Sequence, residues 1–200
     1  MKLLKQNEYK TAAEILKNGG IVAFPTETVF GIGVISGNDE AYEKLIKIKR
    51  RPPEKPFTLM CGDVNDIKKY AIVDKIADKL IKKFMPGQFT IILPALETTE
   101  KNAVSAGMVG IRVSSDNLVT NLIKAVGKPL FVPSANKAGE KPAYTSSEVL
   151  NIFNDELDAI IEGESVSNVP STIVQVKDGN VLRRRLGAIT EEDIAKAIKE

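Results

Sequence analysis

Short apolar runs alternate with amphipathic segments along most of this 200-residue chain. Runs such as 21–24, 89–93 and 109–113 have the length and composition of buried strands, whereas 39–50 and 117–126 repeat apolar residues at helical spacing. Helices and strands therefore interleave, but without the strict rhythm that an all-parallel sheet requires. The pattern predicts a single α/β domain with a twisted, mixed β-sheet flanked by helices.

The other expected elements follow from the same two periodicities. Further helices are expected at 6–18, 74–84 and 146–153 and after the capping residue Thr190, and further strands at 57–61, 130–132, 159–161, 173–176 and 180–184. Asp178-Gly179 is typical of a hairpin turn between the last two strands. Strand alternation would then place Arg183 and Arg185 on one face and Arg184 on the other.

Composition excludes several kinds of chemistry. The chain has no histidine and one cysteine, so it cannot hold a histidine base, a Ser-His-Asp triad, a His-ligated metal or a structural zinc site. Cys61 cannot form an internal disulfide, which fits a reducing compartment. No apolar run approaches the ~20 residues of a membrane span, and the polar N-terminal segment is unlike a signal peptide. We therefore expect a cytoplasmic protein with no membrane partner.

A polar stretch follows the first apolar strand, in the sequence PTETVFGIG at residues 25–33. It lacks the Gly-Lys-Ser/Thr of a P-loop and the third glycine of a dinucleotide-binding loop. One interpretation is a connection in which Thr26 and Thr28 contact a ligand and the two glycines permit close approach of the backbone. A turn with a threonine cap explains the same residues.

Cations gather in KIKRRPPEKP, residues 47–56. Arginine and lysine are the usual phosphate-binding side chains, and two prolines stiffen the segment that carries Arg51 and Lys55. The run therefore indicates an anion clamp, although a solvated helix end has the same composition. The net charge of only +2 predicts no strong nucleic-acid affinity for the molecule as a whole.

Two further features point to a pocket. Ser134 and Asn136 follow an apolar strand directly, where they could hydrogen-bond a ligand or close a turn. Arg112 lies inside an apolar strand, where a charge is costly unless it is paired or bound to a ligand.

Taken in order, the motifs PTETVFGIG, IKRRPPEKPF, PGQFTIILP, VGIRV, PSAN, STIV and RLGAI resemble those of the YrdC-like threonylcarbamoyl-AMP synthase family, over residues 8–194. The resemblance implies one YrdC-like domain over residues 1–200, with a deep, positively charged cavity and without the extra C-terminal domain of the family's larger members. It also implies a reaction in which L-threonine, bicarbonate and ATP, with Mg²⁺, give threonylcarbamoyl-AMP and pyrophosphate. The product would serve a tRNA-modifying threonylcarbamoyl transferase complex.

Site residues carried over by motif form two groups. The resemblance implies threonine contacts from Thr26, Arg112 and Thr172, and ATP contacts from Lys49, Arg51, Lys55, Ser134, Asn136 and Arg185. Met60 stands where many members have a threonine-contacting histidine, and methionine cannot donate a hydrogen bond, so its role would be packing or backbone. Ala143 replaces a serine found near ATP, and Leu186 replaces a proline. No residue is assigned as acid, base or nucleophile.

Two other functions fit parts of the sequence. A non-catalytic module could bind double-stranded RNA or tRNA through phosphate contacts at a basic rim, although no aromatic RNA-stacking motif is visible. Another carbamoyl-adenylating enzyme, similar to hydrogenase-maturation proteins, is a second alternative. Those proteins carry zinc-finger-like cysteines, whereas this chain has one cysteine.

Overall fold

The protein is described here from a computed structural model, which covers residues 1–52, 56–167 and 169–199 and confirms the α/β class. The strands are β1 Lys2–Leu4, β2 Val22–Phe24, β3 Gly31–Ile35, β4 Leu59–Cys61, β5 Phe89–Pro94, β6 Val104–Ser105, β7 Met108–Val113, β8 Leu130–Phe131, β9 Ala159–Ile161, β10 Thr172–Lys177 and β11 Asn180–Arg185. Within the described residues, eleven strands form one mixed sheet in the order β1-β9-β2-β3-β8-β4-β7-β5-β10-β11, with β6 beside β7.

Four of the helices in the described residues begin at a capping side chain. The helices are α1 Tyr9–Lys17, α2 Asp39–Lys49, α3 Lys75–Phe84, α4 Asn117–Val126, α5 Ser146–Phe153 and α6 Glu191–Lys199, with 3-10 turns at Gln6–Glu8, Val64–Lys69, Lys101–Ala103 and Asn154–Glu156. Asn38, Asp74, Asp116 and Thr145 each accept a backbone N–H of the first helical turn, which explains where α2 to α5 start. The expected helices are therefore confirmed, except that 6–18 is divided between a 3-10 turn and α1.

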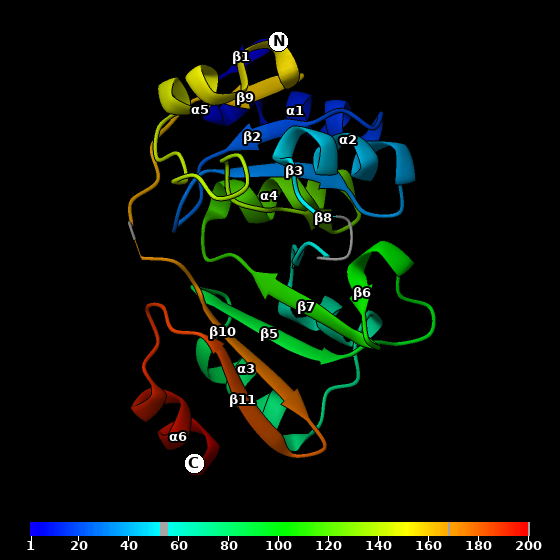
Figure 1. Cartoon of the computed structure of the whole chain (residues 1–200), viewed down its shortest axis with the longest axis vertical. Helices are drawn as coiled ribbons and strands as arrows, with labels where there is room; N and C mark the ends of the chain where they lie inside the picture. The colour runs from blue at the N-terminus through cyan, green and yellow to red at the C-terminus, as the bar shows by residue number, and fades with distance from the viewer. Residues whose placement is uncertain (53–55, 168, 200) are drawn as a thin grey trace.

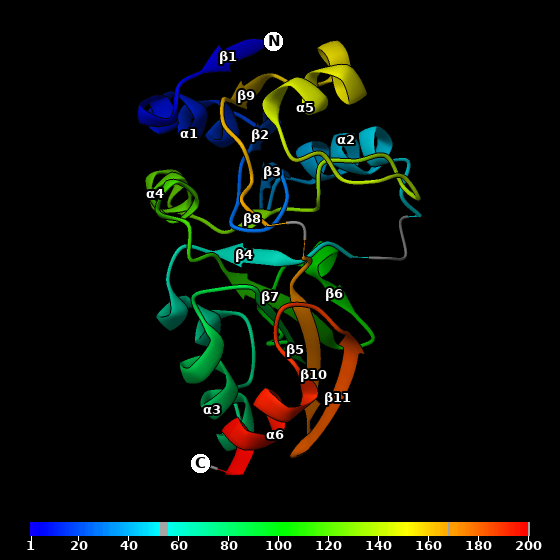
Figure 2. The same ribbon diagram turned by 90° about the vertical axis from the view of Figure 1, so that its left-hand side faces the viewer.

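The sheet joins two halves of the molecule. Figure 1 shows β1, β9, β2 and β3 with α1, α2, α4 and α5 in the upper half, and β5, β7, β10 and β11 with α3 and α6 in the lower half. β4 lies between the halves, and the termini lie at opposite ends (Figure 2). No helix among the described residues is both long enough and apolar enough to cross a lipid bilayer.

Separate apolar clusters hold the helices on the sheet. Leu16 of α1 and Leu122 of α4 pack with Phe24 and Leu130 on one face of the upper half. A larger cluster includes Leu80 of α3 and Ile194 of α6 with Phe89 and Val174 in the lower half. Burial of these apolar side chains stabilises both halves of the molecule.

The glycines of the PTETVFGIG stretch do not lie in a connection, as the sequence analysis placed them. Gly31 and Gly33 belong to β3, which pairs antiparallel with β2 and β8. A Cβ atom at Gly33 would lie 2.7 Å from Cε1 of the buried Phe24 ring, so the absent side chain makes room for that ring. The close approach inferred from the sequence exists, but at Gly33 it serves packing inside the protein.

The face prediction for the three consecutive arginines is wrong. The pairing of β10 with β11 shifts by one residue near the end of β11, which is a β-bulge, and a bulge breaks strict alternation. Arg183 forms an ion pair with Glu191 at the start of α6, whereas Arg184 donates to the side chain of Gln175. Arg185 points to the cavity described below.

The contact between Gly33 and Phe24 gives a stability prediction with a matched control. Gly33→Ala should lower the free energy of unfolding by about 1–3 kcal/mol, because the added methyl group overpacks a buried ring. Gly110 also lies in a strand, but a Cβ atom there would meet Ile92 at an ordinary 3.7 Å, so Gly110→Ala should cost less than ~1 kcal/mol. Urea unfolding of the two variants checks this, and equal stabilities would contradict it.

Candidate functional site

One row of side chains crosses five neighbouring strands, from β4 to the edge strand β11. Met60 of β4 pairs with Arg112 of β7, and Arg112 pairs with Thr90 of β5. Thr90 pairs with Ile173 of β10, which in turn faces Arg185 of β11. Residues paired across neighbouring strands project from the same face, so strand register places these five side chains in line.

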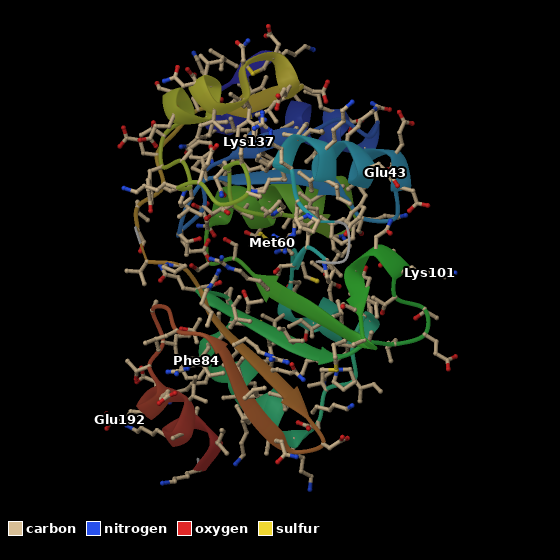
Figure 3. The ribbon with its side chains drawn as sticks, viewed as in Figure 1. Glu43, Met60, Phe84, Lys101, Lys137 and Glu192 are labelled. Carbon is tan, nitrogen blue, oxygen red and sulfur yellow. The ribbon has the colours of Figure 1, made fainter. Side chains whose placement is uncertain are left out.

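This row is the floor of a cavity of about 530 Å³. Loops that follow β2, α2, β8 and β9 supply its walls, with Thr26, Thr28, Val29, Phe30, Gly31, Arg51, Pro56, Phe57, Thr58, Val132, Pro133, Ser134, Asn136, Glu140, Pro142, Tyr144, Pro170 and Ser171. Met60 lies midway between the two halves in Figure 3. Among the described residues, the lining includes three arginines and one carboxylate, Glu140, which favours an anionic ligand.

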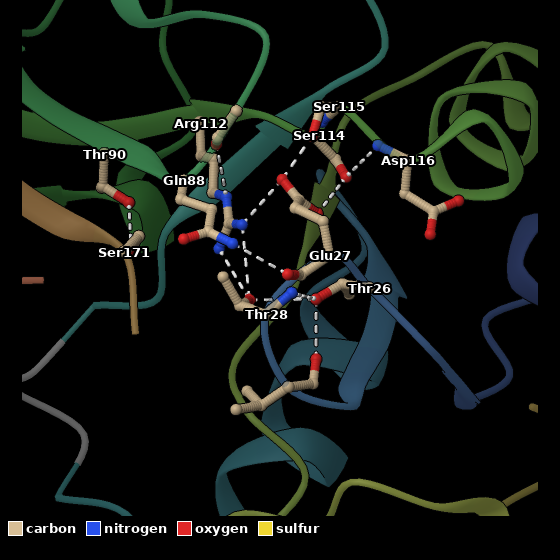
Figure 4. Close-up of polar contacts among 12 residues, drawn as sticks. Thr26, Glu27, Thr28, Gln88, Thr90, Arg112, Ser114, Ser115, Asp116 and Ser171 are labelled. Carbon is tan, nitrogen blue, oxygen red and sulfur yellow. Dashed lines mark hydrogen bonds and ion pairs between the residues drawn. The ribbon is translucent and has the colours of Figure 1, made fainter. Parts of the chain in front are cut away.

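Arg112 is held by a buried ion pair, as its place inside a strand predicts. Its Nη2 lies 2.8 Å from Oε1 of Glu27, and both residues are less than 10% exposed. Its Nε donates to the carbonyl of Gly87, and both Nη atoms donate to Oγ1 of Thr28 at 3.3 Å (Figure 4). The guanidinium is therefore fixed in place with its charge largely balanced.

Glu27 is the other half of this arrangement and was not singled out by the sequence analysis. Ser114 Oγ donates to its Oε2 at 2.5 Å, and the backbone N–H of Ser115 donates to its Oε1 at 3.1 Å. Burial by itself would raise the pKa of the Glu27 carboxyl, but the Arg112 charge and the Ser114 hydrogen bond outweigh burial and lower it. Glu27 thus stays ionised and ties the β2–β3 loop to the turn that precedes α4.

Thr26 and Thr28 form a capped turn, as one interpretation of their loop predicts, and their contact with a ligand stays a prediction. Thr26 Oγ1 donates to the carbonyl of Val29 at 2.7 Å and accepts the backbone N–H of Thr28, so it closes a turn. Both threonines nevertheless line the cavity. The capped turn therefore places Thr26 and Thr28 at the cavity wall.

Lys49 lies behind the cavity wall. It is buried, it does not line the cavity, and its Nζ donates to the carbonyls of Ser134 and Asn136 and to Oδ1 of Asn136. Burial lowers the pKa of Lys49 to about 8, with smaller effects from the nearby charges of Arg51 and Lys137. Three acceptors match the three N–H groups of an ammonium, so Lys49 holds the turn that carries Ser134.

The same turn fixes what Ser134 and Asn136 offer to a ligand. Ser134 Oγ donates to Oδ1 of Asn136 at 2.6 Å, and the Asn136 amide donates to the carbonyls of Lys137 and Glu140. The amide group of Asn136 is therefore committed within the protein. Ser134 presents acceptor lone pairs to the cavity.

Arg51 is the member of the basic run that reaches the cavity. Its guanidinium lies 4.8 Å from the centre of the Phe57 ring, and Nη2 donates to the carbonyl of Pro56. Burial lowers the pKa of Arg51. Lys55, the other predicted clamp residue, lies outside the described residues. Ala143 is buried behind the wall, where only its backbone bonds to the neighbouring loops.

Thr172 points away from the cavity, and its neighbour Ser171 lines it. Alternation along β10 puts Ser171 and Ile173 on the cavity face and Thr172 on the other. There Thr172 Oγ1 donates to the carbonyl of Ile189 and accepts the backbone N–H groups of Gly187 and Ile189. A contact between Thr172 and a bound amino acid stays a prediction, and this placement does not favour it.

Gly187 fits that packing because it has no side chain. A Cβ atom at Gly187 would lie 2.2 Å from the carbonyl oxygen of Pro170. The RLGAI segment therefore lies directly on the backbone that enters β10. Leu186, in the place of a family proline, is exposed beside it.

Glu27, Thr90 and Ser171 are the residues that sequence reasoning missed. A usable signal existed for Thr90, since it is a polar residue within the apolar run FTIIL, as Arg112 is within VGIRV. Glu27 lies between Thr26 and Thr28, which the sequence analysis had considered as ligand contacts. Ser171 gave no signal of its own, because nothing in the sequence shows which of two adjacent hydroxyls faces inward.

The residues present do not form a metal centre of their own. No group of three His, Cys, Asp or Glu side chains able to hold a metal ion lies in the part of the chain that the structure describes. Magnesium prefers oxygen ligands, and Glu140 is the one carboxylate among the lining residues. A magnesium ion here would therefore need most of its oxygen ligands from a bound molecule.

A family model described as Sua5_yciO_yrdC, telomere recombination, matches residues 14–186. Sua5 of P. abyssi superimposes with a TM-score of 0.94 at 27% identity, over all of this chain and 61% of the Sua5 chain. A second structure of that protein, crystallised with L-threonine, gives 0.92 at 26% identity, over 98% of this chain and 60% of that one. The present chain thus spans about three-fifths of the length of these Sua5 chains.

Two further solved structures share the fold. YciO of E. coli matches with a TM-score of 0.87 at 25% identity, over 96% of this chain and 98% of YciO. Full-length HypF, crystallised in a phosphate- and nucleotide-bound form, gives 0.79 at 23% identity, over 90% of this chain and 29% of HypF. At that identity the HypF match shows the fold alone.

The Glu27–Arg112 pair predicts a defined loss of stability. Glu27→Gln should lower the free energy of unfolding by about 3–5 kcal/mol near neutral pH, because the buried Arg112 loses its counter-charge. The folded pKa of Glu27 lies below its usual 4.5, so its contribution is present above that pH and is lost as pH falls through the lowered value. The difference between wild type and variant should therefore shrink in acid, whereas the exposed Glu43→Gln should match wild type throughout. A difference that does not depend on pH would contradict this.

Thr172 offers a test of structural against ligand-binding roles. Thr172→Val should lower the free energy of unfolding by about 1–3 kcal/mol, because partly buried backbone groups of Gly187 and Ile189 lose their partner. Thr172→Ser keeps the hydroxyl and should stay close to wild type. Chemical unfolding checks both variants. A Thr172→Val protein of wild-type stability with weakened amino-acid binding would instead indicate a ligand contact.

Proposed function

The chain belongs to the Sua5/YciO/YrdC family, and we propose on this premise that it is a nucleotidyltransferase, an L-threonylcarbamoyladenylate synthase. The reaction joins L-threonine, bicarbonate and ATP into threonylcarbamoyl-AMP and releases pyrophosphate and water. The observation that carries the proposal is the cavity, whose described lining holds Arg51, Arg112 and Arg185 against one carboxylate. All three substrates carry negative charge: threonine on its carboxylate, bicarbonate on its oxygens and ATP on its phosphates.

The threonine end is proposed at Arg112. Thr26 and Thr28 line the cavity beside it, and Arg112 keeps N–H capacity beyond its contacts with Glu27, Thr28 and Gly87. A fixed, partly balanced guanidinium suits a substrate carboxylate. L-threonine bound to P. abyssi Sua5 supports this assignment at the level of the family. Met60 contributes an apolar surface next to Arg112.

The nucleotide end is proposed at Arg51, Ser134 and Arg185. Phe57 holds Arg51 toward the cavity through a cation–π contact. Lys49 and Asn136 support this end from behind by fixing the turn around Ser134. Magnesium would enter as the complex with ATP.

The chemistry needs positioning and charge compensation more than a protein nucleophile. The threonine amine, having lost a proton to solvent, attacks the carbon of bicarbonate; a C–N bond forms, a C–O bond breaks, and water leaves. An oxygen of the resulting carbamate attacks the α-phosphorus of ATP, and pyrophosphate departs with the electron pair of the broken P–O bond. Arginines that face anions in a cavity lower the repulsion between them, which suits a chain without histidine.

The product is an activated carbamate and requires an acceptor. We propose that a tRNA-modifying threonylcarbamoyl transferase complex receives it in the cytoplasm. Direct binding of tRNA or double-stranded RNA is the competing function. It gains support if salt-sensitive RNA binding occurs without threonine-dependent turnover of ATP.

Pyrophosphate release from MgATP tests the proposal, with threonine and bicarbonate omitted in turn. Release should require both. Arg51→Met should lower kcat/KM for ATP about 100-fold, because an arginine at the phosphates is removed. The neighbouring Arg50 is exposed and absent from the cavity lining, so Arg50→Met is the matched control and should stay near wild type. Release that ignores threonine, or equal activity of the two variants, would overturn the assignment.

A further inference from the structure

A pair of hydroxyl groups lies on the cavity floor next to Arg112. Thr90 and Ser171 are 3% and 4% exposed, and their oxygens lie 3.1 Å apart. Figure 4 shows them on the side of Arg112 away from Glu27. Both residues line the cavity. They stand in the motifs PGQFTIILP and STIV, but the sequence analysis gave neither of them a role. Buried hydroxyls facing a cavity raise the question of what they bind.

Arg185 completes the group. Its Nε donates to the carbonyl of Ser171 and its Nη2 donates to Ser171 Oγ, both at 3.0 Å. Of the five N–H groups of this guanidinium, two are thus used, and the described residues supply no acceptor for the other three. The planar guanidinium of Arg185 is therefore hydrogen-bonded along one edge, and its other edge has N–H groups available for a ligand.

The hydroxyl protons also leave one donor over. Each hydroxyl carries one proton, and one of the two makes the bond between Thr90 and Ser171 in whichever direction it runs. Among the described residues, neither hydroxyl has a second acceptor, so one O–H remains for a ligand. The group therefore presents an O–H donor and several N–H donors to the same part of the cavity.

The charges at the two ends of the floor are unequal. Arg112 has Glu27 as its counter-ion, whereas Arg185 has no carboxylate within ion-pair distance in the described part of the chain. Burial, together with the charge of Arg112, lowers the pKa of Arg185. Arg185 as a residue is exposed, but it lines the cavity, and a cation there without a carboxylate partner favours a bound anion. The hydrogen-bond donors and the positive charge thus both favour the same kind of ligand, a small oxyanion.

We propose that Thr90 and Ser171, together with Arg185, form the bicarbonate subsite of this enzyme, between the amino-acid end at Arg112 and the nucleotide end. Arg185 lies at the border of the two and serves both, since the edge held by Ser171 leaves its remaining N–H groups open. The inference rests on the proposed function. Neighbouring strands lie about 4.8 Å apart, so an anion above Thr90 is one strand away from a carboxylate held at Arg112. That separation brings the carbon of bicarbonate within reach of the amine of the bound amino acid. A phosphate of ATP has the same donor requirements and is the competing occupant.

Steady-state kinetics in buffers depleted of CO₂ separate these occupants. Thr90→Val and Ser171→Ala should each raise KM for bicarbonate about 10-fold or more, since a hydrogen bond to an anion is lost. KM for threonine and for MgATP should stay within about 2-fold of wild type. Thr90→Ser restores a hydroxyl and should return KM for bicarbonate toward the wild-type value.

Thr99→Val is the matched control. The Thr99 hydroxyl is also buried, but it donates to the carbonyl of Tyr70 and does not line the cavity. Its loss should lower stability without changing KM for bicarbonate. Equal effects of Thr99→Val and Thr90→Val on KM would overturn the subsite, and a rise in KM for MgATP alone would assign it to a phosphate.

A direct binding measurement keeps the two proposals apart. The ¹³C resonance of labelled bicarbonate should broaden on addition of wild-type protein and stay sharp with Thr90→Val. If wild type releases no pyrophosphate, the synthase assignment fails, while selective broadening would still support an oxyanion subsite at Thr90 and Ser171. Absence of broadening with wild-type protein would overturn the subsite even where turnover is present.

Discussion

An arginine in the middle of a β-sheet needs a counter-charge, and Glu27 supplies it to Arg112 from the loop between β2 and β3. The same carboxylate accepts the Ser114 hydroxyl and the Ser115 N–H, so the pair fixes the β2–β3 loop against the turn before α4. The ion pair thereby links the loop that carries Thr26 and Thr28 to β7, which carries Arg112. The ion pair also balances most of the charge of Arg112. Arg185 is then the cation on the cavity floor that has no carboxylate partner among the described residues.

The cavity floor depends on strand register and the walls depend on loops. Register alone aligns Met60, Arg112, Thr90, Ile173 and Arg185 across five strands, although they span 126 positions of the chain from 60 to 185. A shift of one residue in any strand would turn its side chain to the opposite face. The bulge at the end of β11 is such a local shift, and it brings Arg185 to the cavity. Gly33 and Gly187 permit the close packing that holds the neighbouring segments in place.

Several motif residues act behind the surface that a ligand meets. Lys49 and Asn136 use their donors on the protein itself, and Thr172 joins β10 to the RLGAI segment. A misplaced turn can disturb binding as a lost contact does, so a motif can hold supporting side chains as well as ligand contacts. A motif therefore identifies a site without separating the residues that bind from those that support them.

Local periodicity determined the α/β class, the helices and most of the strands, because amphipathic spacing and capping residues act over a few positions. The sequence also determined that Arg112 required a partner and that Arg51 belonged to a basic segment. It could not name Glu27 as that partner, place Gly31 in a strand, or choose Ser171 over Thr172 as the inward hydroxyl. Those outcomes depend on pairing between strands far apart in the chain, on a bulge, and on which hydrogen-bonding groups remain unsatisfied once the loops meet. The tertiary structure alone decided them, since contacts between distant segments leave no trace in local spacing.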